Sequence, residues 1–300
     1  MTEYAIEARD VHKSFGGEPV VRGVDLRVPS GEIAVLMGPN GEGKTVLMCC
    51  LAGGLSPTRG DVLVHGRGAA EASEDLSLLS QGALALPELD ARENVAFYSR
   101  LHPAGSGDAD LLFDALDLEE TDGKPLRDFS GGMARKVELA VALNADVSTY
   151  LLDEPTAELD PSAVAALHDV LASTRAAGRT IVMTSHSPVD ARIADRLVFL
   201  AGGRVVANGP PDRLLENVPS VLRVRGAIHR ARGRIEEFLV SGYGFERGDE
   251  VRGFLRERYD GNGIGPVGSA LGDDCPIQVE EPSYADMFEY YTSVVPGRDQ

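Results

Sequence analysis

The sequence predicts an α/β fold, with a mostly parallel sheet at its centre and a small α+β domain at the C-terminal end. The apolar runs Ile33–Met37, Thr149–Leu152 and Thr180–Thr184 have the length and continuity of buried strands. Helical patterns separate these runs along the chain, as connections between parallel strands require. The length of 300 residues suits a domain of about 200 residues followed by a smaller one.

The other elements of the first domain follow from local patterns. Residues 4–28 alternate in short β-like pieces, which predicts a small antiparallel subdomain. Asp160 is an N-cap residue, Pro161 stands at the first helical position, and Gly178 ends that helix. Between about residues 82 and 145 the pattern is helical, which predicts a helical insert with the segments Arg92–Leu101, Ala109–Leu118 and Met133–Leu143.

The chain changes character beyond Pro210-Pro211, and we place the domains at residues 1–218 and 219–300. Ser283 and Asp286 form an S-x-x-D capping box at the start of the last helix. The other predicted elements are a helix at Asp212–Asn217, a strand at Val221–Val224, helical patterns at Ile228–Val240 and Asp249–Arg258, and a Gly-rich loop at Gly261–Gly272. Five arginines form a basic run, which is either a solvated face or a contact for acidic protein or lipid headgroups: Arg223, Arg225, Arg230, Arg232 and Arg234.

Composition excludes several classes of protein. The formal net charge of −18 argues against non-specific nucleic-acid binding, so we expect no nucleic acid as a partner. The chain has neither a long apolar run nor a secretory signal, which predicts a cytoplasmic protein. Cys49 and Cys50 are neighbours and Cys275 is remote, which is typical neither of a disulfide framework nor of a metal-binding pair.

A phosphate-binding motif follows the strand Ile33–Met37. The eight residues 38–45 match G-x-x-x-x-G-K-[ST] between a strand and a helix, where backbone N–H groups and the helix N-terminus bind polyphosphate. We expect Lys44 to contact the β- and γ-phosphates and Thr45 to coordinate Mg²⁺. A Gly-rich turn without a ligand is the alternative. The predicted nucleotide contacts in this segment are Gly38, Pro39, Asn40, Gly41, Glu42, Gly43, Lys44, Thr45 and Val46.

Two acidic residues follow the strand Thr149–Leu152. A buried strand that ends in Asp153 is expected to bring a Mg²⁺-binding carboxylate beside the phosphates. Glu154 is then placed to polarise the attacking water. Two surface acids at a strand end are the alternative.

A second phosphate-binding helix end is predicted at Ser130-Gly131-Gly132. These residues open the periodic stretch Met133–Leu143, and Ser is a favourable N-cap. By itself the tripeptide is also explained by an ordinary capped turn.

Taken together, these motifs resemble those of ATP-binding-cassette (ABC) ATPases. The phosphate loop, Ser130-Gly131-Gly132, Asp153-Glu154, Glu158-Leu159-Asp160 and His186 occur in the order found in that family. The resemblance implies a P-loop NTPase core, ATP and Mg²⁺ as cofactors, and ATP hydrolysis. It also implies a head-to-tail dimer in which Ser130-Gly131-Gly132 of one subunit closes over ATP bound to the other. The second cassette would be another copy or a paralogue.

The resemblance assigns roles to three further residues. It suggests that Gln81 links Mg²⁺ or water to a membrane partner, that Phe15 stacks on adenine, and that His186 contacts the γ-phosphate. The alternatives are a solvated loop residue, a core strand residue and a hydrogen-bonded histidine, respectively. Departures from the family pattern are Glu42, Ser80, Met133 and Glu158, none of which removes a catalytic group.

A narrower resemblance concerns the C-terminal tail. Residues 279–288, Val-Glu-Glu-Pro-Ser-Tyr-Ala-Asp-Met-Phe, are similar to the terminal motif of daunorubicin-resistance-type exporter ATPases. This implies the ATP-hydrolysing subunit of an exporter, peripheral on the inner face of the cell membrane through a separately encoded permease. A soluble ABC ATPase that acts on a protein partner, such as the iron–sulfur assembly type, is the alternative.

Overall fold

The structure, a computed structural model, describes residues 3–82, 85–105, 109–121, 123–225, 235–247, 250–256 and 276–295. The chain divides into two compact units, Met1–Val205 and Val206–Gln300. The sequence placed a domain boundary later, after residue 218. The helix α6 (Pro211–Glu216) lies before that position, but it contacts the last helix of the second unit, and the Tyr291 hydroxyl donates a hydrogen bond to the Leu214 carbonyl.

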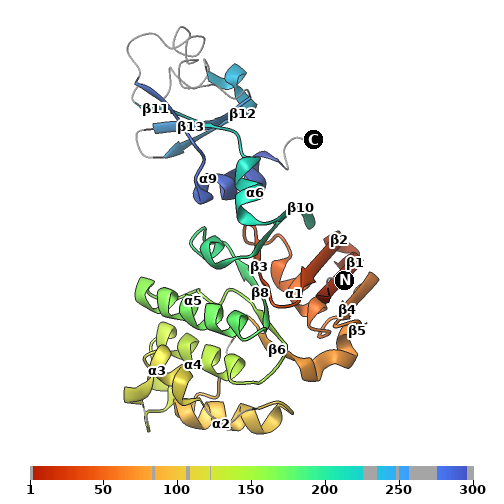
Figure 1. The fold of residues 1–300 in the computed structure, drawn as a ribbon, viewed down its shortest axis with the longest axis vertical. Helices are drawn as coiled ribbons and strands as arrows, with labels where there is room; N and C mark the ends of the chain where they lie inside the picture. Colours follow the sequence, from red (N-terminus) through yellow and green to blue (C-terminus); the bar gives the residue numbers. More distant parts are fainter. Residues whose placement is uncertain are drawn as a thin grey trace. The chain divides into compact units, whose positions relative to one another are not determined.

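A six-stranded sheet in the order β10-β9-β3-β8-β7-β6 forms the centre of the first unit (Figure 1). The strand β3 pairs in parallel with β8 and β9, and β7 pairs in parallel with β6 and β8. Every residue of β3, β7 and β8 is buried, which confirms the predicted core strands. The strand bounds are β3 (Ile33–Met37), β6 (Leu76–Leu79), β7 (Thr149–Leu152), β8 (Thr180–Ser185), β9 (Arg196–Ala201) and β10 (Arg204–Gly209).

A four-stranded sheet in the order β2-β1-β4-β5 forms the predicted antiparallel subdomain. Its strands are β1 (Tyr4–Phe15), β2 (Glu18–Pro29), β4 (Arg59–Val64) and β5 (Arg67–Gly68), with a 3-10 helix, η1 (Ala69–Asp75), after the last. The helix α1 (Lys44–Leu51) lies between this sheet and the central one. A single apolar core joins all three, and it includes Val24, Leu47 and Leu200.

The helical segments of the first unit form where they were predicted, although the second ends at Ala115 rather than at Leu118. They are α2 (Ala91–Leu101), α3 (Asp110–Ala115), α4 (Gly131–Leu143) and α5 (Pro161–Ala176), with the 3-10 turns η2 (Glu119–Thr121), η3 (Leu126–Asp128) and η4 (Asp190–Ile193). Asp160 caps α5 by accepting hydrogen bonds from the N–H groups of Ser162 and Ala163. Gly178 adopts the left-handed conformation, with φ of 87°, just beyond the C-terminus of α5.

A second antiparallel sheet, in the order β12-β13-β11-β14, forms the core of the second unit. The aromatic ring of Phe254 packs edge-on against Tyr290, with 5.1 Å between the ring centroids. The elements are β11 (Val221–Arg225), η5 (Glu236–Phe238), β12 (Leu239–Arg247), β13 (Glu250–Leu255), β14 (Ile277–Glu280), α9 (Tyr284–Glu289) and a π-helical turn, η6 (Tyr290–Val294). The predicted α+β class of this unit is therefore confirmed.

One helical prediction in this unit was wrong. Asp249–Arg258 was expected to be helical, but Glu250–Leu255 is the strand β13. Val251, Phe254 and Leu255 are spaced as on a helix face, but the backbone pairs with β11 on one side and β12 on the other, and all three side chains are buried. In Ile228–Val240, the described part contains η5 and the start of β12, and the remainder lies outside the described residues. The Gly261–Gly272 loop and Cys275 also lie outside them.

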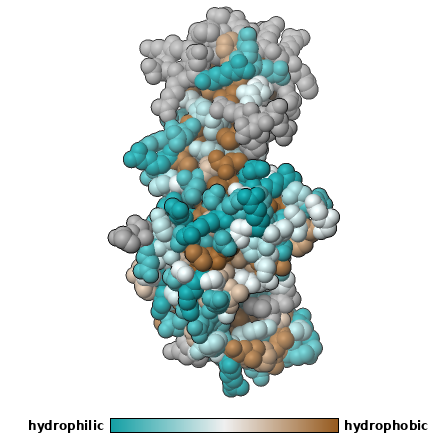
Figure 2. Space-filling view, turned by 90° about the vertical axis from the view of Figure 1, so that its right-hand side faces the viewer, coloured by the Kyte–Doolittle hydropathy of each residue, from teal (hydrophilic) through white to brown (hydrophobic). Residues whose placement is uncertain are grey.

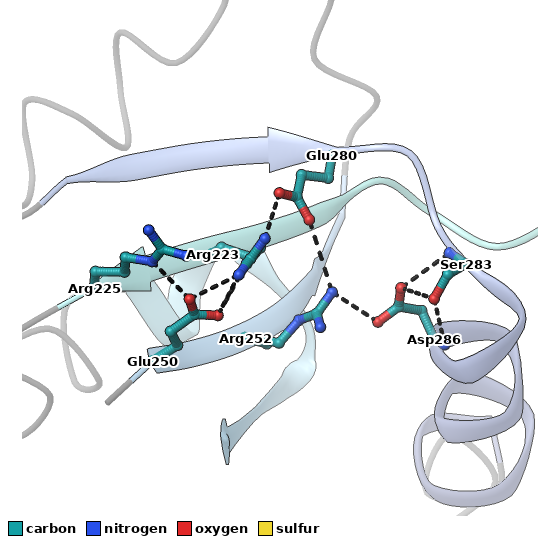
Figure 3. A network of polar contacts seen from close by, with 7 residues as sticks. All are labelled: Arg223, Arg225, Glu250, Arg252, Glu280, Ser283 and Asp286. Carbon is teal, nitrogen blue, oxygen red and sulfur yellow. Dashed lines mark hydrogen bonds and ion pairs between the residues drawn. The ribbon is translucent and has the colours of Figure 1, made fainter. Parts of the chain in front are cut away.

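The basic run does not form a free cationic face in its described part (Figure 3). The Arg223 guanidinium donates to both Glu250 carboxylate oxygens at 2.7 Å and to Glu280 at 2.5 Å. Arg225 donates to Glu250 at 2.6 Å. Hydrogen bonds from Arg223 and Arg225 hold the pKa of Glu250 below its ordinary value. The charges of Arg223 and Arg225 are thus balanced within the unit, whereas Arg230, Arg232 and Arg234 lie outside the described residues.

The described surface in the view of Figure 2 is mostly hydrophilic, with separate apolar patches. This distribution accords with the strongly acidic composition. In the described part of the chain, no helix has both the length and the apolar character needed to cross a bilayer.

Candidate active site

The phosphate loop connects the end of β3 to the start of α1, as predicted. Gly41 and Gly43 both adopt φ of 88°, in the left-handed region that side chains disfavour. A Cβ on Gly38 would lie 2.4 Å from the Leu200 carbonyl oxygen. The glycines of the motif are therefore required by backbone conformation and by close packing against β9.

A pocket of about 370 Å³ opens above this loop. It brings the loop together with Gln81 and Glu154, which lie far away in the sequence. The lining residues are Val20, Asn40, Gly41, Gly43, Lys44, Thr45, Val46, Gln81 and Glu154.

The predicted contacts that do not line this pocket are Phe15, Gly38, Pro39, Glu42, Ser130, Gly131, Gly132 and Asp153. The Glu42 carboxylate accepts a hydrogen bond from the Gly202 N–H in the turn between β9 and β10, so it is bound to backbone rather than directed at the loop's amides. The ring of Phe15 is 48% exposed at the end of β1, with the Lys13 ammonium 5.3 Å from its centroid.

The Lys44 ammonium is buried in the loop. It donates hydrogen bonds to the carbonyl oxygens of Gly38, at 2.8 Å, and Pro39, at 3.0 Å. It also lies 3.8 Å from Glu154 Oε1. Burial lowers the pKa of Lys44, although the carboxylates of Glu154 and Asp153 oppose this shift. An anionic ligand in the pocket would favour the charged form of Lys44.

Asp153 follows β7 directly and is 1% exposed. Its Oδ1 atom accepts a hydrogen bond of 2.5 Å from the Thr184 hydroxyl. Its Oδ2 atom is buried and has no hydrogen-bond partner within the described residues. A buried carboxylate oxygen without a partner costs free energy, and a bound cation would satisfy it.

Glu154 combines an unusual backbone with two nearby basic groups. Its φ is 47°, which is strained for a residue other than glycine. Its Oε1 atom lies 3.5 Å from His186 Nδ1 as well as 3.8 Å from Lys44 Nζ. The structure thus brings Lys44, Glu154 and His186 together, as the sequence motifs suggested.

Ser130, Gly131 and Gly132 lie at the N-terminus of α4, and none of them lines the phosphate-loop pocket. The Ser130 hydroxyl caps the helix by accepting a hydrogen bond of 3.3 Å from the Met133 N–H. Gly131 lines a second pocket of about 450 Å³, together with Gln81, Glu154 and Glu158. A Cβ on Gly131 would lie 2.6 Å from Glu158 Oε2, so glycine leaves room for that carboxylate.

Two further side chains near Glu154 were not identified from the sequence. The Thr184 hydroxyl accepts a hydrogen bond of 2.8 Å from the Glu154 N–H, and Arg135 donates to the carbonyl oxygens of Asp153 and Glu154. A polar residue within an apolar strand was a signal for Thr184. Arg135 carried no such signal, because an arginine in a helical pattern is usually exposed.

A buried carboxylate joins the segments after β7 and β8. Asp190 is 0% exposed and accepts hydrogen bonds from the hydroxyls of Ser185, at 2.5 Å, and Thr156, at 2.8 Å. His168 Nε2 on α5 lies 2.8 Å from its other oxygen. This network fixes the segment that carries His186 against the segment that follows Glu154.

Comparison with known proteins identifies extensive similarity. The model of the ABC transporter family matches residues 21–157. Daunorubicin resistance ATP-binding protein DrrA3 of Streptomyces coeruleorubidus is 35% identical over 245 residues, covering 77% of this chain and 78% of that protein. Nod factor export ATP-binding protein I of Rhizobium etli is 34% identical over 223 residues, covering 71% of each.

Solved structures are similar in fold. The structure of an ATP-binding subunit of an ABC transporter has a TM-score of 0.65 and 25% identity, and the match covers 71% of this chain and 92% of that one. A dimeric bacterial ABC transporter cassette, MJ0796, has a TM-score of 0.64 and 24% identity, covering 69% and 98% respectively.

Proposed function

Because the chain belongs to the family of ABC transporter ATPases, which bind and hydrolyse ATP, we propose that it is the ATP-hydrolysing subunit of an export system. In this proposal it acts as a dimer of cassettes, a homodimer or one formed with a paralogue, on a separately encoded membrane permease. It would lie on the cytoplasmic face of the membrane through that permease.

The observation that carries the proposal is the convergence of Lys44, Glu154 and His186 at the phosphate loop. The backbone N–H groups of the loop and the Lys44 ammonium would bind the phosphates and neutralise charge that develops on the γ-phosphate. Glu154 would accept a hydrogen bond from the attacking water and orient it. His186 would contact the γ-phosphate beside Glu154.

The residues present fit a magnesium ion. The unpartnered, buried Oδ2 of Asp153 supports a cation beside the phosphates, and Thr45 and Gln81, which line the pocket, would supply neutral oxygen ligands. When bound, Mg²⁺ would neutralise phosphate charge. We propose Thr45, Gln81 and Asp153 as its protein ligands.

The separate location of Ser130-Gly131-Gly132 supports a composite site. None of these residues lines the pocket of its own phosphate loop, although the pocket of Gly131 shares Gln81 and Glu154 with it. In the proposal they contact ATP bound to the second cassette. Phe15 is exposed and is proposed to stack on the adenine ring.

The relatives favour an exporter over a soluble ABC ATPase. One is a drug-resistance protein and another is an export protein by name. The match to the drug-resistance protein covers 77% of the chain, which is more than Met1–Val205 alone, so it includes part of the second unit.

Substitution of the proposed base tests the hydrolytic part of the proposal. Glu154→Gln retains the shape of the side chain but polarises water weakly, so hydrolysis should fall by at least about 100-fold while ATP binding persists. Steady-state phosphate release and equilibrium ATP binding measure the two effects. A control, Glu74→Gln, alters an exposed carboxylate of η1 and should leave both unchanged. Near-normal hydrolysis by Glu154→Gln would remove Glu154 from this role.

The permease is tested by reconstitution. We expect a multi-span membrane protein encoded beside this chain to co-purify with it in detergent and to increase its ATP hydrolysis. If the membrane protein neither co-purified with the chain nor increased its hydrolysis, while the chain itself still hydrolysed ATP, the soluble alternative would be favoured.

A further inference from the structure

The backbone of Glu154 requires an explanation that the reaction itself does not supply. Its φ of 47° lies in the left-handed region, which is unfavourable for residues with a side chain. Such a conformation persists only where the surroundings hold it. The backbone conformation of Glu154 also sets the direction of its Cα–Cβ bond. It therefore determines where the Glu154 carboxylate points.

Two side chains hold this turn from opposite elements. The Thr184 hydroxyl on β8 accepts the Glu154 N–H. From α4, one nitrogen of the Arg135 guanidinium, Nη2, donates to the Asp153 carbonyl oxygen at 2.7 Å and to the Glu154 carbonyl oxygen at 2.9 Å. The two carbonyl groups that flank the strained φ are thus bound by a single donor.

Arg135 is itself fixed. It is 8% exposed, and its Nη1 atom donates to Glu138 Oε2 at 2.9 Å, one turn further along the same helix. Its Nε atom is buried and has no hydrogen-bond partner in the described part of the chain. A buried N–H group without a partner is unfavourable. The ion pair with Glu138 therefore does not by itself explain why the Arg135 guanidinium is buried at this position.

The position of Arg135 on α4 connects two functional segments. It stands one helical turn after Gly131, on the helix whose first residues are proposed to contact ATP of the second cassette. A shift of α4 would therefore change the hydrogen bonds at Glu154 of the same chain. A helix such as α4 moves as a rigid element and would carry Arg135 with it. The turn at Glu154, which two side chains hold, can then change conformation.

We propose that Arg135 is a positioning residue for ATP hydrolysis: it holds the Glu154 backbone in its left-handed conformation and couples the carboxylate of Glu154 to the position of α4. Arg135 does not touch the reacting atoms. It acts through Glu154, and the inference rests on the proposed role of Glu154 in hydrolysis.

The first test compares three single variants by kcat and KM. Arg135→Lys keeps the charge beside Glu138 but loses the rigid fork that reaches both carbonyl groups. We expect its kcat to fall about 10- to 100-fold, as for a misplaced catalytic group, with KM for ATP changed less than about 3-fold. Glu138→Gln keeps the Arg135 bonds to Asp153 and Glu154 and should retain kcat within about 3-fold. Lys136→Met removes the neighbouring charge, whose ion pair is with exposed Asp117, and should behave like the wild type.

A second test separates positioning from a purely structural role. The double variant Arg135→Met with Glu138→Met removes the buried ion pair without leaving an isolated charge, so the fold should persist. A structural role predicts normal kcat for this variant, whereas positioning predicts the same loss as Arg135→Lys. Melting temperature and ATP affinity establish that the double variant is folded, which keeps the test valid even if Arg135→Lys is unstable.

A third measurement tests whether the effect passes through Glu154. Adding Arg135→Lys to Glu154→Gln should lower the residual hydrolysis by less than about 2-fold, because the carboxylate that Arg135 positions is already absent. Multiplicative losses would overturn the inference, as would a wild-type kcat in either Arg135 variant. If Glu154→Gln alone left hydrolysis at the wild-type rate, the proposed role of Glu154 in hydrolysis would be wrong. That outcome is measured without any change at Arg135, so it is distinguishable from a failure of the Arg135 proposal.

Discussion

Lys44 carries its ammonium group in a buried position beside two carboxylates, and this determines how pH should affect ATP binding. Burial lowers the pKa of Lys44 below 10.5 in the free protein. Bound phosphates would favour the charged form and raise that pKa again. ATP binding should therefore take up a proton at alkaline pH, and ATP affinity should fall as the pH rises through the free-protein pKa of Lys44.

Calorimetry in buffers of different ionisation enthalpy measures this proton uptake between about pH 7 and pH 10. Lys44→Arg serves as the control, because arginine stays charged throughout this range and should show no such uptake. Equal uptake in the two proteins would assign the proton to another group.

The neighbourhood of Glu154 shows which residue-level properties the sequence could predict. The order of the motifs predicted Lys44, Glu154 and His186 as one site, and the structure places Lys44 Nζ 3.8 Å and His186 Nδ1 3.5 Å from Glu154 Oε1. The left-handed backbone of Glu154 was not predictable. It depends on the parallel register of β7 and β8, which places Thr184 beside Asp153, and on packing against α4.

Elements with strong local signals formed where the sequence predicted them. The capped helix α5 and the fully apolar strands β3, β7 and β8 are examples. The strand β13 was mistaken for a helix because Val251, Phe254 and Leu255 follow a helical spacing. Its conformation is decided by pairing with β11 and β12, which are non-local contacts that a local pattern does not contain.

The start of α9 provides a test of element stability. The buried Asp286 carboxylate accepts hydrogen bonds from the Ser283 N–H and hydroxyl and pairs with Arg252 Nη2 at 3.0 Å. Ser283→Ala removes only the hydroxyl contribution to the cap and should lower the free energy of unfolding by about 1 kcal/mol. Asp286→Ala also leaves the Arg252 guanidinium buried without this partner, so we expect a loss of about 3 kcal/mol.

Urea denaturation followed by circular dichroism measures both losses. The exposed pair of Arg213 and Glu216 provides a control, since Arg213→Ala should change stability by less than about 0.5 kcal/mol. Equal effects of Ser283→Ala and Asp286→Ala would show that the ion pair with Arg252 contributes little.

At the scale of the whole molecule, the sequence predicted a nucleotide-binding unit followed by a smaller α+β unit, and both are present. The motifs also divide into two groups on the first unit. Lys44 lines one pocket and Gly131 lines another, and Gln81 and Glu154 line both. We therefore propose that each chain contributes its phosphate loop to one ATP site and its Ser130-Gly131-Gly132 segment to another. This proposal predicts that two chains are needed for an active site, which can be tested.

Mixing two inactive variants tests this arrangement. Lys44→Ala removes the phosphate contact, and Ser130→Arg blocks the end of α4, so each homodimer should be inactive. A head-to-tail heterodimer contains one site in which Lys44 and Ser130 are both intact. If an equal mixture pairs at random and its sites act independently, ATP hydrolysis should recover to about a quarter of the wild-type rate.

The control for this experiment mixes Lys44→Ala with a chain that carries both Lys44→Ala and Ser130→Arg. Every dimer in that mixture lacks Lys44 in both sites, so no activity should return. Differently tagged chains establish how much heterodimer forms in each mixture. Abundant heterodimers without recovered hydrolysis would mean that each chain completes its own site, and the head-to-tail dimer would have to be abandoned.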